Sequence, residues 1–131
     1  MVKPTITSGR PGRLILLLLK TRSEFLSAFL RRNGYAVSEA QAPDNLVALC
    51  MNNPVHAVIV DICELGEIEG WSVAQSVKVV NSALTVVLLC HGEIPEVELP
   101  TGVDALATDS DLPGLLMILD RHTEKKAAAH H

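Results

Sequence analysis

The chain has 131 residues, of which 48% are hydrophobic and 3% aromatic, and its formal net charge is −4. This length suits one domain with an aliphatic core. The charge balance and the lack of a long basic run argue against a nucleic-acid-binding surface. The longest apolar run, Leu14–Leu19, is far shorter than the ~20 residues of a membrane span. Cys50, Cys63 and Cys90 form no CxxC pair, so we expect reduced thiols and a cytoplasmic location away from the membrane.

Strand-like and helix-like segments alternate along most of the chain. The strand candidates are short apolar runs, typical of strands buried on both faces. The helix candidates repeat apolar residues every three to four positions and have capping residues at their ends. The predicted strands are residues 14–19, 35–40, 55–60, 84–89 and 103–108, and the predicted helices are residues 21–32, 44–51, 71–80 and 111–122.

This alternation predicts an α/β fold with a doubly wound, flavodoxin-like parallel sheet of five strands in the order 2-1-3-4-5 and helices on both faces. Residues 92–101 hold two prolines and three glutamates, so the fourth helix is expected to be short or degenerate. The expected domain covers residues 14–122, between a flexible arm (1–13) and a tail (123–131) whose Ala127–His131 segment resembles a linker with the start of a histidine tag.

Three short sequence motifs follow one another at characteristic spacings. They are Gly34-Tyr35-Ala36-Val37 with Glu39-Ala40 after it, His56-Ala57-Val58-Ile59-Val60-Asp61 before a loop ending at Gly70, and Gly102-Val103-Asp104-Ala105. In their order and spacing they resemble the CheY-like receiver domain of bacterial two-component response regulators. The resemblance extends over roughly residues 14–121.

The resemblance implies a phosphoacceptor position and a set of helpers. In receivers the aspartate that ends the third strand takes a phosphoryl group from a histidine kinase, and here that position is Asp61. Two acidic residues after the first strand hold Mg²⁺, which neutralises the charges of the attacking carboxylate and the phosphoryl donor. A lysine after the fifth strand pairs with the phosphoryl oxygens, and a serine or threonine after the fourth strand bonds to them.

This chain departs from that pattern at every helper position. A gapless alignment puts Leu17-Leu18 at the acidic pair, whereas a shortened loop puts Lys20 and Thr21 there. Cys90 replaces the hydroxyl residue, and Asp109 replaces the lysine. Neither alignment supplies a carboxylate for the metal, so we expect no Mg²⁺ and no other cofactor. The chain therefore resembles a degenerate receiver, or pseudo-receiver.

Lys20 stands where receivers have an acid and Asp109 where they have a lysine, so the two charges are exchanged. This leaves the role of Lys20 open. An ion pair from Lys20 to Asp61 or Asp109 would neutralise the pocket permanently, and the alternative is that Lys20 projects into solvent. Glu64, Glu67 and Glu69 form an acidic loop that either replaces the metal ligands or is simply solvated.

The predicted function is a signalling domain, not an enzyme, that binds a protein partner or forms a homodimer. A histidine kinase and an output domain are the candidate partners, and the final helix is the candidate docking surface. One alternative is a receiver that still accepts phosphate on Asp61. A second alternative is a small thiol enzyme centred on Cys90, whose thiol would need a nearby base to lower its pKa.

Overall fold

The computed structural model describes residues 13–18, 24–40, 42–61, 67–93, 99 and 102–129. In this part of the chain five parallel strands form one sheet in the order β2-β1-β3-β4-β5, which confirms the predicted fold and strand order. The strands are β1 (Leu14–Leu18), β2 (Ala36–Ala40), β3 (Val55–Asp61), β4 (Thr85–Cys90) and β5 (Ala105–Thr108), and the helices are α1 (Glu24–Arg32), α2 (Pro43–Asn52), α4 (Glu67–Val80) and α5 (Leu112–Ala129).

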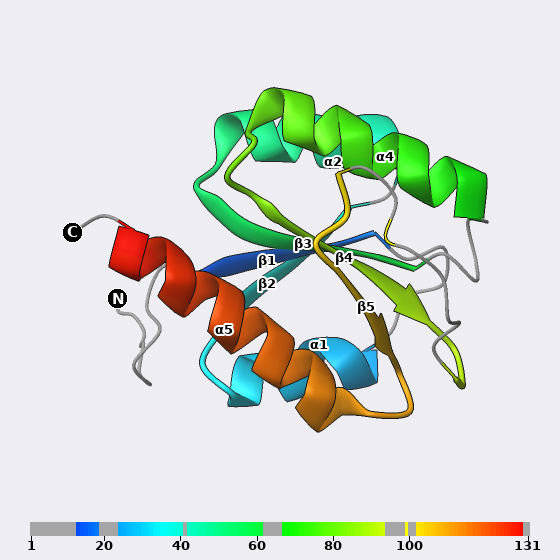
Figure 1. The fold of residues 1–131 in the computed structure, drawn as a ribbon, viewed down its shortest axis with the longest axis vertical. Helices are drawn as coiled ribbons and strands as arrows, with labels where there is room; N and C mark the ends of the chain where they lie inside the picture. The colour runs from blue at the N-terminus through cyan, green and yellow to red at the C-terminus, as the bar shows by residue number, and fades with distance from the viewer. Residues whose placement is uncertain are drawn as a thin grey trace.

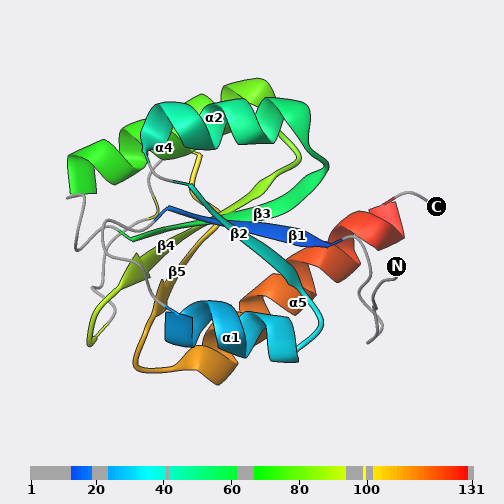
Figure 2. The ribbon, with the colours of Figure 1, turned by 180° about the vertical axis from the view of Figure 1, so that it is seen from behind.

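Helices cover both faces of the sheet. α2 and α4 lie on one face, and α1 and α5 lie on the other (Figures 1 and 2). The alternation of side chains along each strand divides the core accordingly. On β3, for example, Val58 and Val60 pack with the α2/α4 cluster, whereas Ala57 and Ile59 pack with the α1/α5 cluster.

The central strand β3 is buried along almost its whole length. It pairs with β1 on one side, where Leu18 lies opposite Val60, and with β4 on the other, where Leu89 lies opposite Asp61. Ile59 is fully buried, and burying a side chain of that size contributes about 1.5–3 kcal/mol. The strand thereby fixes Asp61, its last residue, at the carboxyl edge of the sheet.

Helix α1 differs in one detail from the predicted apolar stripe. Leu26 and Leu30 face the core as expected and Phe29 is partly buried, but the side chain of Phe25 is 71% exposed. Ser27 is buried in its place, and its Oγ donates to Glu39 Oε2 at 3.3 Å. The buried stripe thus runs through Leu26, Leu30 and Ser27, and Phe25 lies at its outer margin.

Two helices are longer than predicted. α4 begins at Glu67, so the second half of the expected acidic loop is the first turn of this helix. α5 continues past His122 to Ala129, through a segment of lysine and alanine residues. Glutamate, lysine and alanine are all strong helix formers, which explains both extensions.

The expected degenerate fourth helix lies partly outside the described residues. Of the segment between β4 and β5, the structure describes residues 91–93, 99 and 102–104, and none of them is helical. Among the described helices none is long and apolar enough to cross a membrane.

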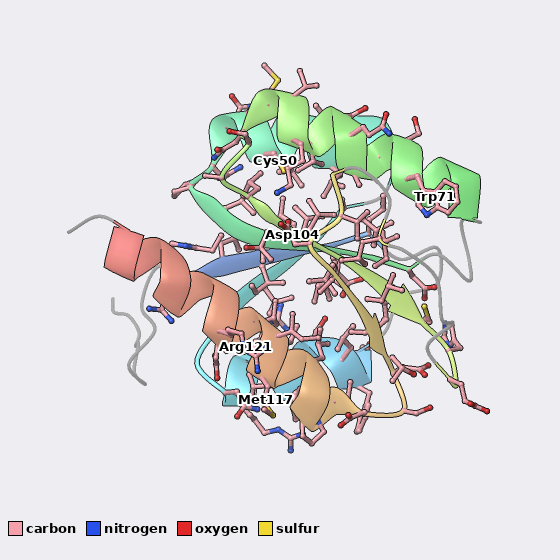
Figure 3. All side chains as sticks on the ribbon, in the orientation of Figure 1. Cys50, Trp71, Asp104, Met117 and Arg121 are labelled. Carbon is pink, nitrogen blue, oxygen red and sulfur yellow. The ribbon has the colours of Figure 1, made fainter. Side chains whose placement is uncertain are left out.

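Asp104, in the Gly102-Val103-Asp104-Ala105 segment at the start of β5, has a structural role. Its Oδ2 accepts the N–H of Val86 and pairs with Nζ of Lys78 on α4, both at 2.8 Å, while its own N–H donates to the carbonyl of Val86 at 2.9 Å (Figure 3). Because Val86 is fully buried, this carboxylate satisfies a donor that water does not reach.

Asp104→Ala should lower the free energy of unfolding by about 1–3 kcal/mol, because it leaves the N–H of Val86 buried without its acceptor. Lys78→Ala is the matched control. It removes only a partly exposed ion pair and should cost less than about 1 kcal/mol. Urea unfolding of both variants checks this, and equal losses would show that the ion pair, not the N–H acceptor, is what matters.

Candidate functional site

Three polar side chains meet at the carboxyl edge of the sheet. Asp61 ends β3, His91 directly follows β4, and Asp109 directly follows β5. These strands are neighbours in the sheet, so the residues after them converge although they are far apart in sequence. In open parallel sheets this edge is where ligands and chemistry are found.

His91 bridges the two carboxylates. Its Nε2 lies 3.2 Å from Oδ2 of Asp61, and its Nδ1 lies 2.5 Å from Oδ2 of Asp109. The side chain of Asp61 is 7% exposed, whereas those of His91 and Asp109 are 48% and 39% exposed. We call this arrangement, Asp61–His91–Asp109, the His91 bridge.

The surroundings of the ring favour its protonated form. The hydrogen bond with Asp61 raises the pKa of the His91 imidazole above its ordinary value of 6.5, and the negative charges of Asp61 and Asp109 act in the same direction. Partial burial of the ring lowers the pKa but is outweighed. The bridge therefore places a ring whose charged form is favoured directly beside the carboxylate that ends β3.

Backbone contacts hold Asp109 and the loop after β4 in place. The N–H of Asp109 donates to the carbonyl of Cys90 at 3.0 Å, and the N–H of Gly92 donates to Oδ1 of Asp109 at 3.4 Å. The hydroxyl of Thr108 donates to the carbonyl of Gly92. Gly92 has a φ of +77°, a conformation that glycine adopts without strain and that turns the chain back toward β5.

The structure places three of the predicted site residues and leaves two outside its described part. Asp61 and Asp109 belong to one cluster, as their positions after β3 and β5 suggested. Cys90 is close in sequence, but it is only 4% exposed and packs in the α2/α4 cluster. Lys20 and Thr21 lie outside the described residues, so the Lys20 ion pair stays a prediction.

His91 is the residue that the sequence analysis missed. The sequence pattern pointed to Lys20 as the cation of this site and did not single out His91. The available signal was its position, because the residue after β4 lies between the ends of β3 and β5 in a sheet of this order. A histidine there can contact two carboxylates at once, because its ring carries a nitrogen on each side.

The last two residues of β1 do not fit the magnesium site of receivers. Leu17 and Leu18 are fully buried and pack in opposite clusters of the core, so the gapless alignment supplies only aliphatic side chains. Magnesium requires hard oxygen ligands in octahedral geometry. In the described part of the chain no three histidine, cysteine, aspartate or glutamate side chains gather as metal ligands. Glu64 lies outside that part, and Glu67 and Glu69 belong to α4.

Comparison with known proteins identifies the fold. The N-terminal domain of a response regulator/sensory box/GGDEF three-domain protein from Carboxydothermus hydrogenoformans is similar with a TM-score of 0.70, at 20% identity over 91% of this chain and 100% of that one. A CheY-like receiver domain protein from Methanospirillum hungatei JF-1 is similar with a TM-score of 0.69, at 17% identity over 86% of this chain and 98% of that one.

The chain has the receiver fold. NtrX from Brucella abortus, solved in complex with ATP, contains the same fold with a TM-score of 0.76, at 16% identity over 91% of this chain but only 28% of NtrX. No family model matches the sequence. No curated protein matches it either. At these identities the receiver fold itself is what the proteins share, and the residues of the site need their own argument.

The His91 bridge should make stability depend on pH. Because the pKa of the folded-state imidazole is raised, its stabilising contribution is complete below pH 6.5 and is lost as the pH rises through the folded-state pKa. The free energy of unfolding of the wild type should therefore exceed that of His91→Gln most near pH 6, below the ordinary pKa of the imidazole. The difference should be less than about 1 kcal/mol, because solvent screens a half-exposed ring. A difference that grows toward alkaline pH would contradict this assignment.

Proposed function

We propose that this chain is a receiver-like signalling domain that acts by binding a protein partner or a second copy of itself, without magnesium-dependent phosphorylation of Asp61 and without enzymatic activity. The observation that carries the proposal is the His91 bridge, because the carboxylate at the acceptor position is already paired with a cation from its own chain. In the described part of the chain neither Cys50 nor Cys90 forms a disulfide, which agrees with action in the cytoplasm.

The charges around Asp61 oppose phosphoryl transfer. A phosphoryl donor is anionic, so it must approach a carboxylate past groups that neutralise both. Here the end of β5 presents the carboxylate of Asp109 in place of a lysine, and it shares His91 with Asp61. Removing one preorganised charge-stabilising group typically costs about 2.7–4 kcal/mol in the transition state. The loss of the metal ligands and the lysine together should slow the reaction by several orders of magnitude.

A second candidate function is that of a receiver that still accepts phosphate. It is favoured by the position of Asp61 at the end of β3 and by the imidazolium beside it, which could take part of the role of the missing lysine. It requires His91 to leave Asp109 or Asp109 to move, because both carboxylates now share the ring. The thiol-enzyme alternative is weaker, because the Cys90 thiol is buried and so is poorly accessible to a substrate.

The proposed docking surface is the outer side of α5. Met117 is 61% exposed there and Arg121 is exposed close to it along the helix (Figure 3). Tyr35 ties the helix to the rest of the domain, because its hydroxyl donates to Oδ1 of Asp120 at 2.5 Å. In the Carboxydothermus protein a domain of this fold precedes further domains. We accordingly propose an output domain or a histidine kinase as the partner, and residues 14–122 as the receiver-like unit, flanked by an arm (1–13) and a tail (123–131).

Incubation with acetyl phosphate and Mg²⁺ should leave the intact mass of the wild type unchanged, because the acceptor carboxylate lacks the groups that neutralise the donor. Asp61→Asn provides the background for the same measurement. Partner binding or self-association should be nearly the same in this variant as in the wild type. Addition of one phosphoryl group to the wild type but not to Asp61→Asn would establish the second candidate function.

Mg²⁺ at millimolar concentration should raise the Tm of the wild type by no more than it raises the Tm of Asp61→Asn. A ligand stabilises a protein only to the extent that it binds the folded state. A thermal unfolding series at increasing Mg²⁺ concentrations measures this. An increase in Tm that saturates with Mg²⁺ in the wild type and is absent in Asp61→Asn would reveal a cation site that uses Asp61.

A further inference from the structure

The His91 bridge uses both nitrogens of one imidazole ring. Ionised carboxylates only accept hydrogen bonds, so each of the two contacts requires an N–H on the ring. The imidazolium has two such donors, whereas neutral imidazole has one N–H and one bare lone pair. The observed pair of contacts, at 3.2 and 2.5 Å, is therefore complete only when the ring is protonated.

The difference in burial decides which contact survives deprotonation. Asp61 is almost fully buried, so water competes less for a hydrogen bond to its carboxylate than for one to Asp109, which is 39% exposed. The remaining N–H should therefore stay with Asp61. The lone pair of Nδ1 would then face the Asp109 carboxylate, and the two acceptors repel each other.

The second contact joins two segments that also meet where the hydroxyl of Thr108 donates to the carbonyl of Gly92. On one side is the loop of His91, Gly92 and Glu93, all three exposed, and on the other is the turn after β5. Besides the bridge, the N–H of Gly92 reaches Asp109 Oδ1 at 3.4 Å, the upper end of hydrogen-bond distances. In the described part of the chain the ionisable groups that face the ring are Asp61 from β3 and Asp109 from β5, and Glu93 lies in the ring's own loop.

We propose that His91 is a proton-dependent link between the ends of β3 and β5: the protonated ring joins both carboxylates, and loss of its proton releases Asp109 and loosens the loop after β4. The link follows from the geometry alone. Its consequence for signalling rests on the proposed function, because this edge of the sheet is the part of a receiver-like domain that responds to its input.

Deprotonation of His91 and release of Asp109 are quantitatively coupled. Proton binding and loop closure are linked equilibria, so each changes the other by the same factor. Each unit by which the pKa of the linked ring exceeds that of the released ring makes release about tenfold more frequent after deprotonation. The exchange of the Gly92 amide reports release directly, because this N–H donates to Asp109 in the linked form.

The test is amide hydrogen exchange of the full chain from about pH 5.5 to pH 9, expressed as protection factors to remove the intrinsic pH effect, together with an NMR titration of His91. Protection at Gly92 should fall in a single step whose midpoint equals that of the imidazole. The amide of Val86, which donates to Asp104 before β5, is the internal reference and should show no step.

Two variants distinguish the effect of the His91 link from a general, pH-dependent loss of amide protection. His91→Gln is neutral at every pH and should show no step. Asp109→Ala removes the oxygens that accept from the ring and from the N–H of Gly92, so Gly92 should show low protection at every pH and no step. A step that persists in either variant, or constant protection at Gly92 while His91 titrates in the wild type, would overturn the proposal. These outcomes are independent of phosphoryl transfer, so they leave the proposed function to its own test.

Discussion

The site depends on the pairing of a buried carboxylate with a cation from the same chain. Asp61 ends the central strand of an aliphatic sheet and its side chain is 7% exposed, and a charge in such a position persists only with a donor or counter-ion beside it. His91 supplies both. The position of the ring follows from the order of the strands, because β4 lies between β3 and β5 and delivers its next residue to the gap between their ends.

This pairing changes how a receiver-type edge can work. The resemblance to receivers implies a cation brought in from solvent and a lysine after the fifth strand, so that the site changes when it is phosphorylated. Here Asp109 stands in place of that lysine, and the group that can carry the positive charge is a histidine shared between two acids. The state of the edge then depends on the proton of one ring. A domain built in this way can hold one conformation for its partner without a phosphoryl group.

The fold could be predicted from the sequence because it rests on local patterns. Apolar runs such as 55–60 identified the strands, and their alternation with amphipathic helices fixed the strand order and the place of Asp61. The His91 bridge could not be predicted in the same way, because it joins residues 30 and 18 positions apart through a loop and a turn whose geometry no local pattern encodes. Alignment to receivers drew attention to Lys20, whereas the cation of the described site lies in a position that receivers do not use for charge. The exposure of Phe25 has a similar origin, because the helical period alone does not decide which side chain at the margin of a stripe reaches the core.

The most direct measurement is the nitrogen-15 chemical shift of both ring nitrogens of His91 in the wild type near pH 7, which distinguishes the imidazolium from either neutral tautomer. If His91 is the internal cation of the site, both nitrogens carry protons and the ring titrates above 6.5, the ordinary value of its pKa. A neutral ring with a single N–H at that pH, or a pKa at or below 6.5, would contradict the account.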